Sequence, residues 1–408
     1  MKALSMTGTF SKAPRAFGFE DELAVESGAG AYIRLNDGSQ LLDFVCGLGA
    51  NLLGYGNREF TQRVIRQVVL GGGFSLPHVL EQQVAEKLVN LLGTRVPGWT
   101  PDTISVRFAK TGSDANSMAV RLARAITGRD IFCHNGYGGW GAEFIAMTPP
   151  ALGIPHNYKK DAFTFDFNAP SSLNAFSFRD DLAAVMLEQG IVEPRVDWYE
   201  FLRTFCNKTG ALLILDEVVT GLRYGLGGVA EKYQVKPDII TMGKALGNGF
   251  PISVVVGRKE YMDWFSRTNP VFCSSTHWGE AVSLAAADAM LDIWNQQEVD
   301  YIWDIGEQLI TEIGGAIDKT GWKIAGHPPR SLMVFQDDYE RAFFIHGMRD
   351  RGILMNRPNF ICSAHTSRDV EKTAAAVSEL AEERKTLDKK ELMNLVEGSL
   401  PHILFTNR

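Results

Sequence analysis

Short apolar runs alternate with amphipathic stretches along the chain from about residue 58 to residue 290. The apolar runs predict strands at 104–109, 130–134, 183–187, 212–216, 238–241 and 252–256. Between the first two runs, residues 113–126 repeat apolar side chains with the spacing of one helix face, at Ala115, Met118, Ala119, Leu122 and Ile126. Strands that alternate with helices indicate βαβ units, so the sequence predicts an α/β fold with a mostly parallel central sheet.

The N-terminal segment has a different pattern. Residues 31–35 and 41–45 are mostly apolar and flank Asn36-Asp37-Gly38. An Asp-Gly pair between two apolar runs predicts a β-hairpin, because glycine accepts the positive φ that a tight turn needs. Residues 1–30 carry few such signals, and we expect an irregular arm there.

The C-terminal part has an α+β pattern from about residue 300. It predicts strands at 331–335 and 353–356, and helices at 341–351 and 367–385. We therefore expect three segments: an N-terminal arm and hairpin (1–57), a large domain (58–298) and a small C-terminal domain (299–408). The small α+β domain is expected to include the N-terminal segment.

Composition excludes several classes of protein. The 408 residues carry a formal charge of −7, which gives no broad electrostatic reason to bind nucleic acid or an anionic membrane. The sequence has no secretory signal and no apolar run of about 18 residues, so we expect a cytoplasmic protein. No CxxC pair occurs among Cys46, Cys133, Cys206, Cys273 and Cys362, which favours free thiols over a disulfide framework or a metal site.

A carboxylate and a lysine follow two of the predicted strands. Asp216 and Glu217 end the apolar run LLIL, and Lys244 lies in the glycine-containing segment TMGKALGNGFP. Each has an ordinary alternative, a turn cap for the acids and a solvated loop position for the lysine. Because parallel strands end at one sheet edge, however, Asp216 and Lys244 are expected to lie close together. Pyridoxal 5′-phosphate (PLP) needs such a pair, a lysine for its aldehyde and an acid for its pyridine nitrogen.

Two further motifs suit the phosphate and the ring of that cofactor. Gly112 and Ser113 follow a strand and open a helix, where free N–H groups and the helix dipole attract an anion. Tyr137 lies in the glycine-rich loop HNGYGGW and can stack on a flat ring. An ordinary serine cap and a half-buried loop aromatic are the alternatives. The chain has no GxxxxGK[ST] motif, which argues against a P-loop phosphate site.

These motifs resemble those of the class III aminotransferases, enzymes of fold type I among the PLP-dependent proteins. Within that class the chain most resembles glutamate-1-semialdehyde 2,1-aminomutases. The resemblance runs from about Pro14 to Glu382. It rests on PRAFG (14–18), VRFAKTGSDA (106–115), RLARAITGRD (121–130), ALLILDEVVTGLR (211–223), PDIITMGKALGNGFP (237–251) and SAHTSRDVEKT (363–373).

The resemblance implies a role for each matching residue. Lys244 matches the Schiff-base lysine and Asp216 the partner of the pyridine nitrogen. Gly112 and Ser113 match the phosphate site, and Tyr137 matches the aromatic over the ring. Thr276 matches a threonine that reaches the phosphate from the neighbouring subunit, which implies a homodimer with shared active sites. Arg15 and Glu188 are the residues expected on the substrate side, and no metal is expected.

The chain departs from the aminomutase pattern around the substrate. Tyr137-Gly138-Gly139 stands where the family has Tyr-His-Gly, a shorter segment follows Glu188, and a glutamate-bearing loop is absent at 356–360. We therefore expect an aminotransferase that moves an amino group from a small amino donor to a carbonyl acceptor. An aminomutase or an amino-acid racemase on the same cofactor site stays open. A non-catalytic binding protein of this fold is the remote alternative, because both Asp216 and Lys244 are retained.

Overall fold

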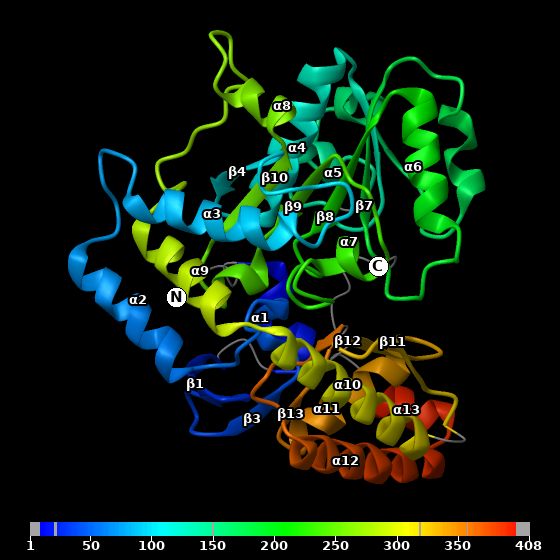
Figure 1. Ribbon diagram of the computed structural model, residues 1–408. Helices are drawn as coiled ribbons and strands as arrows, with labels where there is room; N and C mark the ends of the chain where they lie inside the picture. The colour runs from blue at the N-terminus through cyan, green and yellow to red at the C-terminus, as the bar shows by residue number, and fades with distance from the viewer. Residues whose placement is uncertain (1–8, 20–22, 149–150, 318–319, 357, 397–408) are drawn as a thin grey trace. The chain divides into compact units, whose positions relative to one another are not determined.

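The computed structural model describes residues 9–19, 23–148, 151–317, 320–356 and 358–396 (Figure 1). The described residues form two compact units. The large unit is Arg58–Val299, and the small unit combines the chain up to Asn57 with the chain from Asp300 onward.

The large unit contains a seven-stranded sheet with strand order β4-β10-β9-β8-β7-β5-β6 (Figure 1). Its strands are β4 (Ile104–Ala109), β5 (Ile131–His134), β6 (Ala162–Thr164), β7 (Leu182–Glu188), β8 (Leu212–Glu217), β9 (Ile239–Met242) and β10 (Ser253–Arg258). Only β10 runs antiparallel to its two neighbours. The predicted α/β fold with a mostly parallel sheet is confirmed, although the sequence did not predict β6.

The middle strands of this sheet bring acidic side chains to one edge. Every residue of β7 (LAAVMLE) and β8 (LLILDE) is buried, as expected for parallel strands covered on both faces. Glu188 lies opposite Asp216 in the register of β7 with β8, and Asp216 lies opposite Thr241 in that of β8 with β9. Three polar side chains therefore meet at the carboxyl ends of three neighbouring strands.

The helices of the large unit are α2 (Arg58–Leu70), α3 (Val79–Gly93), α4 (Gly112–Thr127), α5 (Ala142–Ile145), α6 (Trp198–Thr209), α7 (Gly228–Lys232), α8 (Lys259–Met262) and α9 (Ala281–Ile293). Short 3-10 helices are η3 (His156–Lys160), η4 (Pro170–Phe176), η5 (Lys244–Gly247) and η6 (Asp263–Phe265). Helix α4 buries the apolar face predicted from the sequence and ends at Gly128, whose φ of 68° is left-handed.

The small unit has two sheets, ordered β1-β2-β3-β13 and β11-β12-β14. Its strands are β1 (Val25–Ala29), β2 (Tyr32–Leu35), β3 (Gln40–Asp43), β11 (Lys323–His327), β12 (Arg330–Val334), β13 (Ile353–Leu354) and β14 (Asn359–Phe360). The predicted hairpin is β2–β3, with Gly38 at a φ of 87°. Strand β13 pairs in parallel with β3, so the N-terminal segment does belong to the small α+β unit.

The helices of the small unit are α1 (Cys46–Gly49), α11 (Asp338–Asp350), α12 (Ser367–Thr386), α13 (Lys389–Val396), η1 (Phe10–Lys12) and η2 (Pro14–Phe17). Helix α10 (Gln296–Ala316) leads into this unit from the large one. Helix α12 begins at a capping box, in which Thr366 and Asp369 each bind the other's backbone N–H.

The prediction of an irregular arm over residues 1–30 is wrong in part. Residues Val25–Ala29 form strand β1, which pairs with β2 through a bulge near Val25 and Ser27. This edge strand is largely exposed and contains polar residues and a glycine, so it lacks the apolar alternation by which a strand is recognised. Residues 1–8 and 20–22 lie outside the described part of the chain.

No helix among the described residues is both long enough and apolar enough to cross a membrane. The cytoplasmic location stays a prediction from the sequence.

Candidate active site

Asp216 is a buried carboxylate with fixed hydrogen-bond partners. Its Oδ2 accepts a hydrogen bond from Nδ2 of Asn116 at 2.7 Å, and its Oδ1 accepts one from the N–H of Val218 at 3.0 Å. The side chain is only 5% exposed. Two donors thus hold the carboxylate in one orientation at the end of β8.

Asn116 is itself locked in place by two other segments. Its Oδ1 accepts a hydrogen bond from Oγ1 of Thr241 at 2.6 Å, and its Nδ2 also donates to the carbonyl of Gly138 at 2.7 Å. Sequence reasoning gave Asn116 and Thr241 no role. One signal was available: Asn116 is a buried polar residue in a helix whose neighbouring positions are apolar core.

The electrostatics of Asp216 suit a positively charged partner. Burial raises the pKa of Asp216 to about 7, and nearby Glu188 adds to that rise. The hydrogen bonds from Val218 and Asn116 and the charge of Lys244 act in the opposite direction. A cationic donor placed against this carboxylate would therefore be held strongly and would keep it ionised.

Lys244 is the first residue of η5, and only Gly243 separates it from the end of β9. Its backbone φ of 41° is in the left-handed region, which is uncommon for a residue with a side chain and is typical of functional sites. The charge of Lys244 lowers the pKa of Asp216, so the two residues interact electrostatically.

The N-terminus of α4 offers two backbone donors. Thr111 caps the helix, since its Oγ1 accepts from the N–H of Asp114 at 3.1 Å, and its carbonyl accepts from the N–H of Ala115 at 3.1 Å. The N–H groups of Gly112 and Ser113 remain available for a ligand. The helix therefore begins at Gly112 rather than at Ser113, and the cap is a threonine rather than the serine considered from the sequence.

Glycines let the neighbouring loop approach this helix terminus. Gly139 has a φ of 145°, and a Cβ added to it would lie 2.6 Å from Oγ of Ser113. The N–H of Trp140 donates to the same Oγ at 3.2 Å. A Cβ added to Gly112 would lie 2.6 Å from Cγ1 of Val218. Glycine at positions 112 and 139 therefore allows a close approach that any larger residue would prevent.

Tyr137 and Glu188 lie in the same site. The N–H of Tyr137 donates to Oε2 of Glu188 at 2.9 Å. The Asn135 side chain bonds the backbone of Glu188 reciprocally, from Nδ2 to the carbonyl at 2.7 Å and from the Glu188 N–H to Oδ1 at 2.9 Å. These bonds tie the Tyr137 loop to the end of β7.

The assignments of two expected residues, Thr276 and Arg15, stay predictions. Thr276 is exposed, in the loop before α9. The adjacent His277 lines an open cavity of about 450 Å³ together with Lys110 and Glu280, whose side chains form an ion pair at 2.5 Å. The side chain of Arg15 lies outside the described residues.

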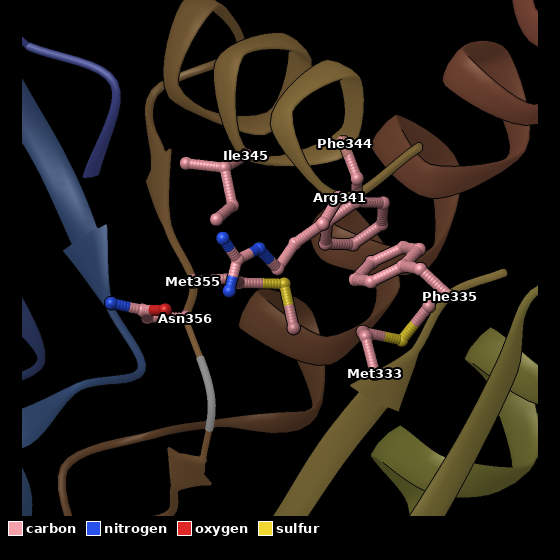
Figure 2. A pocket seen from close by; sticks show the side chains of 7 residues that line it. All are labelled: Met333, Phe335, Arg341, Phe344, Ile345, Met355 and Asn356. Atoms are coloured by element: carbon pink, nitrogen blue, oxygen red, sulfur yellow. The ribbon is translucent and has the colours of Figure 1, made fainter. Parts of the chain in front are cut away.

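The stretch that departs from the aminomutase pattern contributes to a cavity of the small unit. Asn356 lines this space with Met333, Phe335, Arg341, Phe344, Ile345 and Met355 (Figure 2). Figure 2 shows the Arg341 guanidinium extending from α11 between Ile345 and Met355. The cavity measures about 10 Å³, which holds a water molecule but no substrate.

Comparison with known proteins agrees with this geometry. The class-III aminotransferase family matches residues 18–320. The chain belongs to this family. The match covers every cofactor residue predicted from the sequence and also Glu188, while Arg15 lies before its first residue. Members of the family are PLP-dependent enzymes, as the sequence resemblance implied.

Individual relatives agree with the family assignment. A glutamate-1-semialdehyde 2,1-aminomutase of Thermus thermophilus is 31% identical over 392 residues, which are 86% of this chain and 90% of the relative. An omega-transaminase structure from Sphaerobacter thermophilus has a TM-score of 0.81 at 26% identity and covers 89% of this chain and 91% of its own. A transaminase with PLP bound shares the fold, with a TM-score of 0.80 at 24% identity and coverage of 89% and 91%.

The residues present fit PLP. The free N–H groups of Gly112 and Ser113 suit a phosphate, and a Cβ at Gly139 would fill the space beside Ser113. The raised pKa of Asp216 suits a protonated ring nitrogen. Lys244 supplies an amine at the same sheet edge. Phosphate donors, a carboxylate and a lysine are thus all found in the large unit.

Proposed function

We propose that this class III aminotransferase holds PLP through Lys244 and moves an amino group between an amino donor and a carbonyl acceptor. The observation that carries the proposal is the chain of hydrogen bonds from Thr241 through Asn116 to Asp216, beside Lys244. Such a network is expected if Asp216 must bind a ring nitrogen in one fixed orientation. An ordinary turn cap would not need it.

Each residue has a distinct task in this proposal. Bound PLP supplies an electron-accepting ring that stabilises negative charge at the substrate Cα. Lys244 anchors the cofactor, and its amine, once freed by the amino donor, moves a proton at Cα as general base and acid. Asp216 keeps the ring nitrogen protonated. Gly112 and Ser113 hold the phosphate, and Tyr137 packs on the ring.

Glu188 is proposed to act at the substrate side of the site. It lies opposite Asp216 on the neighbouring strand, and its charge contributes to the raised pKa of that carboxyl. Arg15 is proposed as the partner of a substrate carboxylate. Both assignments rest on the family resemblance.

We also propose that the enzyme is a homodimer with shared active sites. Helix α2 and the loop before α3 expose a run of large apolar side chains: Ile65, Val68, Val69, Leu70, Phe74, Leu76 and Val79. A concentration of this kind on one surface region is typical of a protein interface. Thr276 is exposed within a single chain, which suits a residue that reaches the phosphate of the neighbouring subunit.

An aminomutase is the second candidate, and the sequence relatives favour it. The segment after Glu188 argues for a different substrate pocket. Gln189 fixes this segment, since its Nε2 donates to the carbonyls of Gly190 at 3.0 Å and Val192 at 3.2 Å, while Tyr199 donates to its Oε1. The short loop is therefore folded on itself, where the aminomutases have a longer one.

A half-reaction screen tests the proposed function. The purified PLP enzyme is mixed with single amines in the absence of any carbonyl compound, and the visible absorbance of the bound cofactor is followed. A transaminase converts to the aminated cofactor stoichiometrically and releases a carbonyl product. It then needs a second carbonyl compound to turn over. Sustained turnover of one substrate into its isomer, with no second compound, would instead identify an aminomutase.

A further inference from the structure

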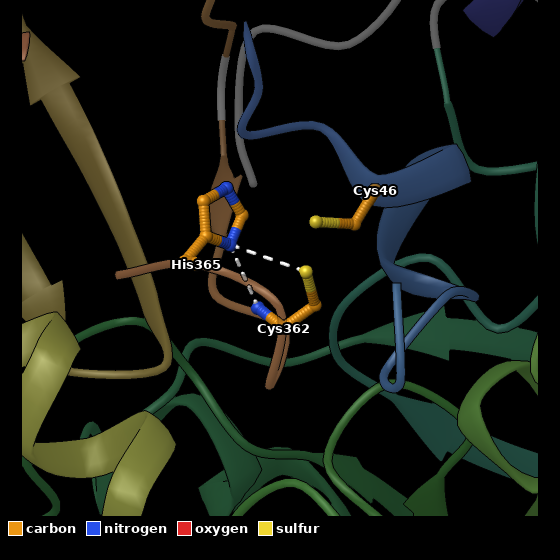
Figure 3. A group of neighbouring side chains, drawn as sticks. All are labelled: Cys46, Cys362 and His365. Carbon is orange, nitrogen blue, oxygen red and sulfur yellow. Dashed lines mark hydrogen bonds between the residues drawn. The ribbon is translucent and has the colours of Figure 1, made fainter. Parts of the chain in front are cut away.

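Two cysteines and a histidine meet in the core of the small unit (Figure 3). Cys46 begins α1, while Cys362 and His365 lie in the turn between β14 and α12. The two Sγ atoms and a ring nitrogen of His365 all lie within 4.8 Å of one another. Figure 3 shows the Cys46 side chain directed at the other two. None of these three residues is among those assigned to the cofactor.

The three side chains are fully enclosed. Cys46 and Cys362 are each 1% exposed and His365 is 0% exposed. The His365 ring stacks on Phe44, with ring centroids 4.5 Å apart and an interplanar angle of 14°. The carbonyl of His365 accepts a hydrogen bond from Tyr301 Oη at 2.7 Å. Packing and hydrogen bonding therefore fix the imidazole against the two thiols.

The ring nitrogen that faces the thiols presents a lone pair. The backbone N–H of Cys362 donates to Nδ1 of His365 at 3.1 Å, which makes Nδ1 an acceptor and leaves the imidazole proton on Nε2. Cys362 Sγ lies 3.2 Å from the same Nδ1. Two sulfur atoms and this imidazole nitrogen form the donor set of a thiophilic metal site, and a bound metal would replace the Cys362 N–H as the partner of the Nδ1 lone pair.

His365 is an unfavourable residue for a purely structural role. Its Nε2 is buried and has no hydrogen-bond partner among the described residues. A buried polar group without a partner destabilises a fold, and an apolar side chain could stack on Phe44 equally well. Cys46 also has a left-handed φ of 49°, which is strained for a residue other than glycine. The strained backbone at Cys46 is understandable if its side chain must be held against Cys362 and His365 to bind a ligand.

We propose that Cys46, Cys362 and His365 bind a Zn²⁺ ion in the core of the small unit. Zn–S bonds of about 2.3 Å and Zn–N bonds of about 2.0 Å in a tetrahedral site separate neighbouring ligand atoms by about 3.5–3.8 Å. The Nδ1–Sγ distance of 3.2 Å and the limit of 4.8 Å lie on either side of these values, so small shifts create the site. The Cys46 thiol donates to the carbonyls of Asp43 and Phe360, each at 3.4 Å, so metal binding would replace this thiol proton beside two oxygen atoms.

Charge favours a divalent cation over a monovalent one. Binding converts two thiols to thiolates and releases two protons, so Zn²⁺ with two thiolates and a neutral imidazole has no net charge. A neutral complex is the arrangement that a buried site tolerates. The ion would also join α1 to the turn before α12, two parts of the small unit that are far apart in sequence.

This proposal differs from the expectation of no metal drawn from the sequence. That expectation rested on the absence of CxxC pairs. The ligands here are a Cys-x-x-His unit, Cys362 to His365, and a third residue, Cys46, that only the folded chain brings close. A pairing so distant in sequence leaves no spacing that could be recognised.

Metal analysis of the full-length PLP enzyme tests the proposal. The protein is produced in zinc-supplemented cells, purified with a reducing agent, dialysed against a weak chelator and analysed by mass spectrometry for metals. We expect one zinc per chain. We also expect growth in cobalt-supplemented medium to give the intense visible bands of tetrahedral Co²⁺ with thiolate ligands, apart from the cofactor absorbance.

Variants separate this site from other thiols. Cys46→Ala and Cys362→Ala should lose the metal, and Cys206→Ala should keep it, since Cys206 is an equally buried cysteine in the large unit. If an alanine variant fails to fold, His365→Gln in the soluble enzyme should still weaken zinc retention at least tenfold. Wild-type protein with far less than one zinc, or an equal zinc content in all variants, would overturn the proposal. So would a disulfide between Cys46 and Cys362, detected as two missing hydrogens in the intact mass under native conditions.

Discussion

The side chain of Asn116 on α4 donates a hydrogen bond of 2.7 Å to Asp216 at the end of β8, and Thr241 on β9 fixes the orientation of that amide. The link joins a helix and two strands around one carboxylate. Asn116 is therefore a positioning residue for Asp216, and its effect on the reaction can be measured separately from its effect on the fold.

Replacing Asn116 by alanine should weaken cofactor binding and catalysis. Loss of one hydrogen bond to a charged group is worth about 1.5–3 kcal/mol, or about 10- to 100-fold in cofactor affinity or in kcat. Because this bond lowers the pKa of Asp216, its removal should also move the acid limb of the pH–rate profile to higher pH. Visible titration with PLP and the pH–rate profile measure both effects. Ser117→Ala, on the same helix but bonded to Glu143, is the matched control. An unchanged acid limb would leave Asn116 a purely structural role.

Replacing Asp216 by asparagine should remove function but stabilise the cofactor-free protein. Burial raises the pKa of Asp216 to about 7 from an unfolded value of about 3.9, so the folded chain binds the extra proton between these values. The free energy of unfolding that this proton contributes is fully present below about pH 4, and it is lost as the pH rises to about 7. Above that pH the buried carboxylate destabilises the fold by a quantity on the order of 2–4 kcal/mol.

Thermal unfolding of cofactor-free wild type and Asp216→Asn at pH 5 and pH 8 measures this effect. The advantage of the variant should be larger at pH 8. An advantage that shrinks with rising pH would contradict the assigned direction of the pKa shift. Glu217, whose pKa burial also raises to about 7, loses the part of that rise that the Asp216 charge adds, and this change favours the variant in the same direction at pH 8.

His134 should make the protein sensitive to mild acid. This buried imidazole stacks on Phe132 and contacts Phe144 edge to face, and burial lowers its pKa from 6.5 to about 4. The unfolded chain therefore binds the proton first, and stability is lost as pH falls from about 6.5 to about 4, by up to about 3 kcal/mol. His134→Phe should flatten this part of the curve of unfolding free energy against pH. His156→Gln, at an exposed histidine, should leave it as in the wild type. Parallel curves for wild type and His134→Phe would exclude this origin of acid sensitivity.

Gly139→Ala should damage the proposed phosphate site. The added Cβ would collide with Ser113, and the φ of 145° would also be strained. Gly153→Ala is the matched control, because Gly153 has a φ of 86° and nothing within 4 Å of an added Cβ. The control should lose about 1 kcal/mol of stability from backbone strain alone. We expect Gly139→Ala to lose at least tenfold in PLP affinity as well, measured by visible titration. Equal PLP affinity in the two variants would argue against a phosphate at this helix terminus.

The sequence predicted the parts of the site that follow from local patterns. Asp216 and Lys244 follow apolar runs that can only be strands, and parallel strands bring their ends to one edge, so their proximity could be predicted. The helix after β4 could be predicted from its apolar face, but its start was predicted one residue late, at Ser113 instead of Gly112. Strand β1 could not be predicted, because an exposed polar edge strand lacks the pattern that burial imposes.

Contacts between distant segments were beyond sequence reasoning. Asn116 finds Asp216 and Thr241 only through the packing of α4 on the sheet, and nothing in the residues around it specifies those partners. The same is true of Cys46, whose neighbours Cys362 and His365 come from the opposite end of the chain. In each case a polar or reactive side chain lies at a buried position. A single sequence points to such a residue only where its burial can be predicted from the surrounding pattern.

Reductive attachment of the cofactor tests the central claim most directly. The PLP-loaded enzyme is treated with borohydride, digested and analysed by mass spectrometry. The account predicts that the cofactor is attached to the peptide that contains Lys244, that Lys244→Ala loses both the label and the visible absorbance of lysine-bound cofactor, and that Lys236→Ala keeps both. A label on another lysine of the wild type, or an undiminished label in Lys244→Ala, would contradict the account.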